Sequence, residues 1–178
     1  MHMLNRLFRH PLLWAGAVAL VLAGCIISGQ FVIVVEWGGI VSTDTQLNDE
    51  FVDLTTNETW QDHKDDIQSI VDAKFEVTIT NNLGTTASGE VYVSDQGNLT
   101  LEDLDTKATR ILFGIEVPGN QSVTIGFNES AQYQENLQTL LDLAETGQFY
   151  LYGVAASTPF NIEIQQGSRI LVTLSAGG

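Results

Sequence analysis

Few of the residue types that perform catalysis are available to this chain. His63 is the only histidine after residue 10, and Cys25 is the only cysteine. A Ser-His-Asp unit needs a histidine beside a serine, and the sequence contains no G-x-S-x-G segment. His63 lies in Asp62-His63-Lys64-Asp65-Asp66, a polar run that is typical of a solvated helix face. The sequence therefore predicts that the protein is not an enzyme.

Metal and nucleotide sites are limited by the same composition. Zinc needs three or four His, Cys or carboxylate ligands, so with His63 and Cys25 alone beside the carboxylates no zinc site is expected. No phosphate loop or dinucleotide fingerprint is present either, so no nucleotide site is expected. Calcium takes carboxylate and carbonyl oxygens, and two acidic segments offer them. The candidates are Asp62, Asp65 and Asp66, expected on one helical face, and Asp95, Asn98, Glu102, Asp103 and Asp105 around a turn. Neither has EF-hand spacing, so a solvated acidic surface is favoured and calcium stays an alternative.

Two tyrosines are candidates for ligand binding. Tyr150 and Tyr152 alternate with Phe149 and Leu151, so both rings project to the opposite face of the expected strand. Exposed rings can stack on sugars, which makes the pair a candidate glycan site. The favoured interpretation is core packing, because the helix expected just before this strand is available to cover that face. The same interpretation applies to Trp60.

Cys25 ends a segment with the features of a secretory signal. The first eleven residues carry Arg6 and Arg9 and no acid, and residues 12–24 are uncharged and apolar. The run ends in Leu22-Ala23-Gly24-Cys25, which resembles the lipobox of bacterial lipoproteins. The resemblance covers only the leader. It implies cleavage between Gly24 and Cys25, diacylglyceryl transfer to the Cys25 thiol, and attachment of the mature protein to membrane lipid.

The residues after Cys25 bear on placement. Residues 25–30 are expected to form a short lipidated tether, which at about 3.3–3.6 Å per residue would hold the domain within about 20 Å of its anchor. Ile26 and Ile27 follow Cys25 in place of an Asp, and by the same resemblance this favours the outer membrane over the inner membrane. The alternative is an uncleaved anchor, but residues 28–30 interrupt the apolar run before about 20 residues are reached.

The charge of the chain limits its partners. It has 22 acidic residues against 7 basic ones, and two of the basic ones, Arg6 and Arg9, lie in the leader. Such a surface repels phosphate backbones and bare anionic headgroups. Nucleic acid and nucleotides are therefore not expected as partners, whereas an envelope protein is.

Alternation of apolar and polar residues dominates residues 31–178, which we expect to form one domain. Phe75, Val77 and Ile79 interleave with polar residues, as expected of a half-buried strand. The other expected strands are 31–35, 90–94, 109–117, 122–127, 149–155, 160–165 and 169–174. About eight short strands separated by turn signals predict a mainly β protein, a β-sandwich of immunoglobulin-like or related type. The last two strands are expected to form a hairpin across Gln166-Gly167.

One or two short helices are expected to pack on the sandwich. Residues 131–146 place Tyr133, Leu137, Leu140, Leu141 and Ala144 on one stripe, with Ser130 as N-cap and Gly147 just past the end. A second helix is expected over about 58–71, after Asn57. Residues 42–58 have no regular pattern and are expected to form a loop.

These features predict a non-catalytic, lipid-anchored cell-envelope protein that acts by protein contact. It would serve as an accessory subunit of a membrane assembly or as a structural surface lipoprotein. The alternative is a calcium- or glycan-binding envelope module.

Overall fold

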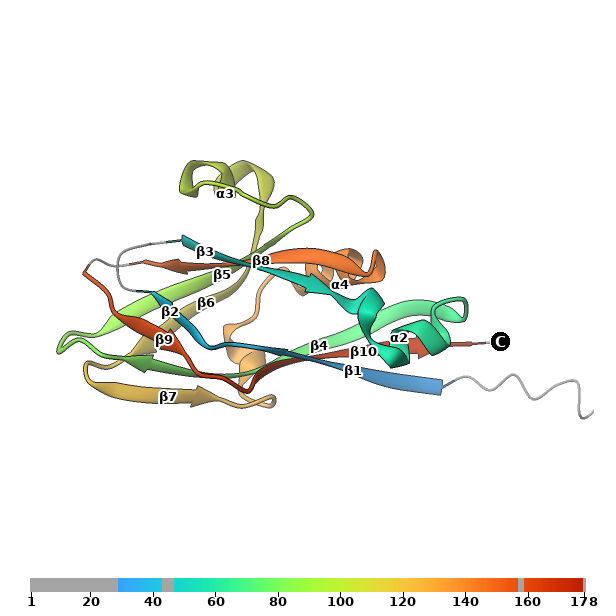
Figure 1. The fold of residues 1–178 in the computed structure, drawn as a ribbon, viewed down its shortest axis with the longest axis horizontal. Coiled ribbons are helices and arrows are strands. Elements are labelled where there is room, and N and C mark those ends of the chain that lie inside the picture. The colour runs from blue at the N-terminus through green and yellow to red at the C-terminus, as the bar shows by residue number, and fades with distance from the viewer. Residues whose placement is uncertain (1–28, 43–46, 157–158, 178) are drawn as a thin grey trace, which may run out of the picture.

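The computed structural model describes residues 29–42, 47–156 and 159–177 (Figure 1). The predicted signal peptide, Gly24 and Cys25 lie outside the described residues. Within them, no helix is both long enough and apolar enough to cross a membrane. The predicted fold class is confirmed, because the described residues form a mainly β sandwich with short helices.

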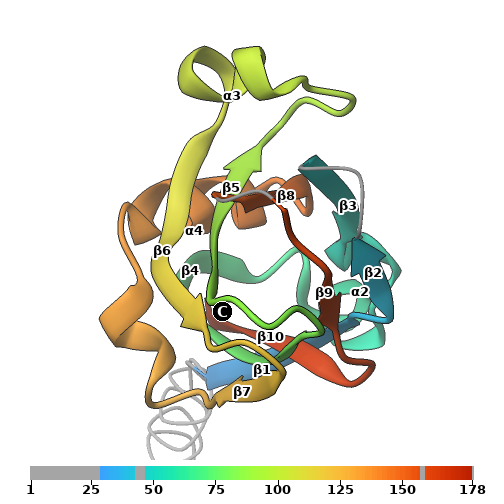
Figure 2. The same cartoon turned by 90° about the vertical axis from the view of Figure 1, so that its left-hand side faces the viewer.

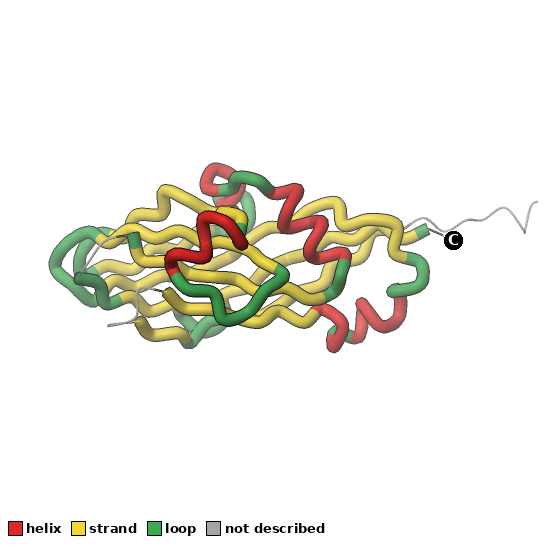
Figure 3. The backbone as a smooth tube through the Cα atoms, turned by 90° about the horizontal axis from the view of Figure 1, so that it is seen from above, coloured by secondary structure: helices red, strands yellow, loops and turns green. Residues whose placement is uncertain are grey.

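Ten strands, two more than predicted, form the two antiparallel sheets of the described chain. The first sheet has the order β1-β10-β4-β9-β2, with β7 paired to β4; its strands are β1 (Gly29–Trp37), β2 (Ile40–Ser42), β4 (Ile67–Asn81), β7 (Gln121–Ile125), β9 (Ile162–Ile164) and β10 (Ser168–Ala176). The second has the order β3-β8-β5-β6; its strands are β3 (Leu47–Asp53), β5 (Ala87–Ser94), β6 (Thr109–Val117) and β8 (Gln148–Ala155). Figure 3 shows the strands running along the long axis, with the helices beside them and across one face.

The predicted terminal hairpin is wrong. Strand β9 pairs with residues 79–81 of β4, and β10 pairs with residues 67–76 of the same strand. Both therefore follow one edge of β4, and the turn at residues 165–167 offsets them without reversing the chain. The backbone N–H of Gln165, in this turn, donates to Thr78 O of β4 at 2.9 Å. Gly167 allows the turn because it adopts a φ of +88°. A local turn signal fails here because pairing with β4 decides the direction of the chain.

The core lies between the two sheets. Phe75, Val77 and Ile79, predicted to share a face, are 1%, 2% and 9% exposed. They meet Phe149 and Leu151 of β8, which are also buried in the same cluster. The alternation therefore identified the inner face of each sheet correctly.

Strand β1 begins two residues earlier than predicted. Gly29 and Gln30, expected in the tether, pair with Ala176 and Ser175 of β10. Only residues 26–28 then separate Cys25 from the first strand.

The helix predicted over residues 58–71 is too long. Helix α2 spans Glu58–His63, and β4 begins at Ile67. Asn57 caps α2 as expected, because its side chain accepts the N–H of Thr59 at 3.0 Å. Ile70 belongs to the buried face of β4 instead, where pairing with β10 stabilises the extended form.

The helix predicted over 131–146 is also shorter. Residues Ser130–Tyr133 form a 3-10 turn, η2, and helix α4 spans Leu137–Glu145 with Asn136 as its N-cap. Ser130 does not cap α4, since its hydroxyl accepts the Phe75 N–H and donates to Phe127 O. Leu140, Leu141 and Ala144 are buried as predicted, and Gly147 follows the helix with a φ of +86°.

Four further elements were not predicted. Strand β3 and a 3-10 turn, η1 (Leu54–Thr56), occupy much of the segment expected to be a loop, and β2 ends at its first residue, Ser42. Helix α3 (Leu101–Lys107) stands on the outer side of the second sheet, between β5 and β6 in sequence (Figure 2). Leu104 of α3 packs against Tyr152 of β8.

Candidate functional site

The first calcium candidate is not arranged as expected. Asp62 lies in α2, but the helix ends at His63, so Asp65 and Asp66 lie in the turn before β4 and share no helical face with Asp62. All three residues are exposed. The backbone of Asp66 accepts the Gly177 N–H at 3.0 Å, which ties this turn to the end of β10.

The residues of the second calcium candidate lie in different elements: Asp95 follows β5, and Asp103 lies within helix α3. The Asp103 carboxylate accepts from the N–H and hydroxyl of Thr100 at 3.0 and 2.8 Å and from Lys107 Nζ at 2.7 Å. The bond from Lys107, with the bonds from Thr100, lowers the pKa of Asp103 to about 2. Asp95 is exposed in the turn after β5. Over the described ranges, no three His, Cys, Asp or Glu side chains gather closely enough to hold a metal ion.

The two tyrosines have different environments. Tyr152 is 0% exposed, and its hydroxyl donates to Gln96 O at 2.7 Å. Its ring packs with Leu99 and Leu104, so the prediction that Tyr152 packs in a core is correct. The covering residues come from α3 and the loop before it, and not from α4 as predicted. Tyr150 is half-buried, with its ring centroid 4.9 Å from that of Phe51. Trp60 is buried in the main core as predicted.

A paired charge cluster lies at the outer side of β5 and β6. Arg110 Nη1 donates to Glu90 Oε1 at 2.7 Å, and Arg110 Nε bonds Glu135. The Tyr92 hydroxyl donates to Glu90 at 2.8 Å. Burial, followed by this hydrogen bond, raises the pKa of Tyr92. Each charge in the cluster has a partner, which fits a structural role in joining β5, β6 and the segment before α4.

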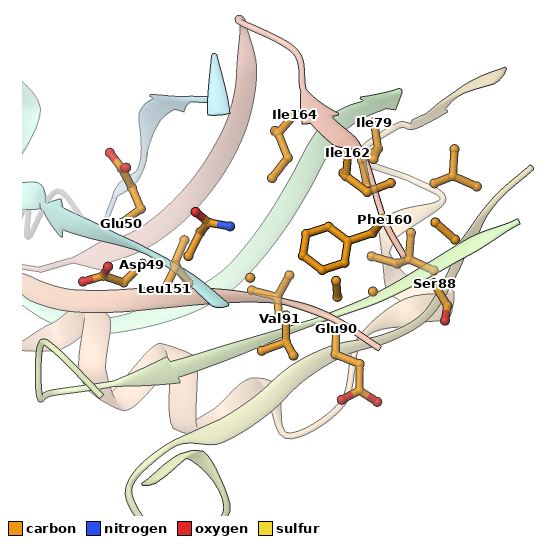
Figure 4. A pocket seen from close by; sticks show the side chains of 18 of the residues that line it. Asp49, Glu50, Ile79, Ser88, Glu90, Val91, Leu151, Phe160, Ile162 and Ile164 are labelled. Carbon is orange, nitrogen blue, oxygen red and sulfur yellow. The ribbon is translucent and has the colours of Figure 1, made fainter. Parts of the chain in front are cut away.

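A cavity of about 100 Å³ lies between the sheets (Figure 4). One wall carries large apolar side chains from the first sheet and the segment before β9: Trp37, Ile79, Phe160, Ile162 and Ile164. The opposite wall, from the second sheet, includes five small residues of β5 and β8 beside larger ones such as Val91, Val117 and Leu151; the small residues are Ala87, Ser88, Gly89, Gly153 and Ala155. Phe160 extends into the middle of this space in Figure 4. The small residues of β5 and β8 therefore leave space opposite the large side chains of the first sheet.

Trp37 places a polar atom in this apolar surrounding. The side chain is 9% exposed, and its indole Nε1 is buried with no hydrogen-bond partner among the described residues. Buried polar groups are normally paired, since leaving one unpaired costs about 1–3 kcal/mol. Trp37 is thus an unusual residue in the lining of the cavity.

One sequence signal for this cavity is the glycine and alanine content of β5 and β8. Gly89 and Ala155 are cross-strand partners, as are Val91 and Gly153, so β5 and β8 carry small residues at alternate positions of one face. A glycine inside a strand often marks a close backbone approach or a ligand. The facing wall could not be inferred, because it comes from strands whose pairing is non-local.

The end of the domain nearest Cys25 in sequence is built from three segments. Gly29 of β1 pairs with Ala176 of β10. The rings of Phe31 and His63 stack with centroids 3.7 Å apart and an interplanar angle of 24°, which attaches α2 to β1.

No model of a known protein family and no curated protein matches the sequence.

Proposed function

We propose that this chain is a lipid-anchored, non-catalytic protein of a bacterial cell envelope that acts through contact with another envelope protein. The lipobox resemblance supports attachment through Cys25, and the Ile26-Ile27 pair favours the outer membrane. Because β1 begins at Gly29, the three residues between them reach about 10–14 Å. The domain then rests against the bilayer, where other membrane components are its neighbours.

The observation that carries the contact role is an exposed apolar surface on β1. Val32 and Val34 are 48% and 44% exposed, whereas Ile33 between them is 1% exposed. Val34 pairs with Leu171 of β10, so the two side chains lie on the same outer face. We call Val32, Val34 and Leu171 the β1 face. Strand β1 is also terminal in the strand order of its sheet, which makes it accessible to a neighbouring protein.

Charge near the anchor favours a protein neighbour over direct headgroup binding. Asp62, Asp65 and Asp66 are exposed next to Lys64 in and after α2, and α2 contacts the start of β1. Anionic headgroups attract Lys and Arg clusters, not carboxylates. The lipid on Cys25 would therefore hold the domain at the membrane, and the β1 face would provide the specific contact.

A second candidate is glycan binding on the outer face of the other sheet. Phe51 is 46% exposed beside the half-buried Tyr150, and their ring planes are inclined at 41°. Exposed rings of this kind can stack on sugars. Titration with soluble envelope oligosaccharides tests this role: binding that is lost in Phe51→Ala supports it, and no binding by the native protein removes it.

Crosslinking in intact cells tests the contact role. A photoreactive amino acid is placed at Val34 and, as a control, at Phe113 of β6, which is 40% exposed on the other sheet. We expect one discrete protein adduct from position 34, its loss when Val32→Asp is added, and no such adduct from position 113. Thermal unfolding checks that Val32→Asp remains folded. No protein adduct from position 34, or the same adduct from both positions, would contradict the proposal.

A further inference from the structure

The cavity between the sheets has a specific cause in the sequence. Gly153 of β8 pairs with Val91 of β5, and Val91 belongs to the core cluster. Cross-strand partners share a face, so a side chain at position 153 would point between the sheets. A Cβ built on Gly153 meets no atom within 4 Å. The missing side chain at this position leaves space that an ordinary strand residue would fill.

This space is not explained by backbone geometry. Gly153 is absent from the glycines with positive φ among the described residues, so the backbone there accepts an L-residue. A glycine inside a strand costs about 0.5–1 kcal/mol relative to alanine, and the empty volume beside it forgoes packing. Stability alone therefore favours a larger residue at position 153.

Trp37 points independently to a ligand. It lines the same cavity, and its buried indole N–H has no partner among the described residues. An indole N–H is only a donor, so a molecule that satisfies it must present an acceptor. A ligand with an acceptor atom and an apolar body would satisfy the unpaired donor and also fill the empty volume.

The rim of the cavity restricts the charge of that ligand. Glu50 is exposed and pairs with Leu151, a core residue, so its side chain lies on the sheet face that borders the cavity. Asp49 and Glu90 also border the cavity, but their side chains lie on the outer face of the sheet: Asp49 pairs with Tyr152, and Glu90 is paired with Arg110. No lysine, arginine or histidine lines the cavity within the described chain. An anionic group entering the cavity would therefore meet the Glu50 carboxylate and no cation.

We propose that this cavity is a binding site for a small neutral apolar molecule, or the neutral apolar end of a larger one, that carries a hydrogen-bond acceptor for Trp37 Nε1–H. An engineered apolar cavity of about 150 Å³ is large enough to bind benzene. The cavity is smaller than this, at about 100 Å³, but its rim is open, so a six-membered ring can enter it with part of the molecule left at the rim. This site is separate from the β1 face, and each can fail without the other.

The first test observes the Trp37 indole directly. The purified protein is reconstituted in lipid nanodiscs with ¹⁵N in its indole rings and titrated with cyclohexanone, a neutral ring with one acceptor. We expect a saturable shift of the Trp37 N–H resonance and no shift of the Trp60 resonance, since Trp60 does not line the cavity. Cyclohexanecarboxylate, which has the same ring size and is anionic at pH 7, is expected to bind at least tenfold more weakly.

Two variants then separate volume from hydrogen bonding. Gly153→Leu fills the cavity, so we expect loss of cyclohexanone binding with a melting temperature equal to or above that of the native protein. Trp37→Phe keeps an aromatic ring and removes the donor, so we expect affinity to fall about three- to tenfold, as for one ordinary hydrogen bond. Trp60→Phe is the matched control, and binding should not change in it. Gly153→Ala provides a milder filling variant should the leucine variant fail to fold.

The proposal is overturned if cyclohexanone produces no saturable shift of the Trp37 resonance in the native protein. It is equally overturned if folded Gly153→Leu, or Gly153→Ala in its place, binds as tightly as the native protein. Equal affinity in Trp37→Phe and Trp60→Phe would remove the hydrogen bond from the proposal, and tighter binding of the carboxylate would overturn the stated ligand class.

Discussion

The Asn81 side chain lies 2.9 Å, Nδ2 to O, from the backbone carbonyl of Val117, and this bond joins the end of β4 in one sheet to the end of β6 in the other. The same Nδ2 donates to Thr85 O at 2.7 Å, and Asn81 Oδ1 accepts the Leu83 N–H at 3.0 Å. Asn81 is 0% exposed. One buried amide therefore fixes the turn after β4 and its position against the second sheet.

Replacing this amide should be costly. Asn81→Ala leaves three backbone groups without their partner, and a buried unsatisfied group costs about 1–3 kcal/mol. Because the turn can admit some water, we expect the free energy of unfolding to fall by about 2–4 kcal/mol in urea denaturation. Asn82→Ala is the control at the neighbouring exposed residue, with an expected change below about 0.5 kcal/mol. Similar losses in both variants would show that Asn81 has no special role.

The buried hydroxyl of Tyr152 should stabilise the loop that precedes α3. It donates to Gln96 O at 2.7 Å and accepts the Leu99 N–H at 3.4 Å. Tyr152→Phe keeps the ring and leaves the Leu99 N–H unpaired, so we expect a loss of about 1–2 kcal/mol in the free energy of unfolding. Tyr150→Phe, at the half-buried ring, should change it by less than about 0.5 kcal/mol. Equal effects would mean that the ring contacts, not the hydroxyl, hold this loop.

Asp103 should titrate in the acid range. Its pKa is lowered from 3.8 to about 2, chiefly by the hydrogen bond from Lys107. The stabilisation of α3 by this carboxylate is therefore fully present above about pH 4 and is lost as the pH falls through about 2. NMR titration of the Asp103 side-chain carbon should give a midpoint near 2 in the native protein and a higher one in Lys107→Gln.

The matched control for this titration is Lys74→Gln, which removes a lysine paired with Asp72 elsewhere on the surface. It should leave the Asp103 midpoint unchanged. An Asp103 midpoint near 3.8 in the native protein would contradict the assigned role of Lys107.

Prediction from sequence succeeded where strands have one buried face. Phe75, Val77 and Ile79 alternate with polar residues because every second side chain of the strand faces the core and must be apolar. It failed for β3, because this strand lies at a sheet edge and carries Asn48, Asp49 and Glu50 in succession. It also failed for residues 67–71, where a helical apolar spacing coincides with a strand that pairs with β10.

The candidate site was less accessible to sequence analysis than the fold. The carboxylates predicted as calcium ligands are dispersed or used locally, as Asp103 is in capping α3. The cavity depends on Gly153 facing Trp37 and Phe160 across two sheets, and that relationship is set by long-range pairing. A glycine within β8 was the one local signal, and its meaning depended on which strands lay opposite.

Intact-mass spectrometry of the protein extracted from membranes tests the central claim, that the domain is held to the envelope by a lipid on Cys25. We predict one species that begins at Cys25 and exceeds the mass of the unmodified chain by a diacylglyceryl group, with or without a further acyl chain. Cys25→Ser should lack this added mass. An unmodified species that retains residues 1–24 as the main membrane-bound form would contradict the claim.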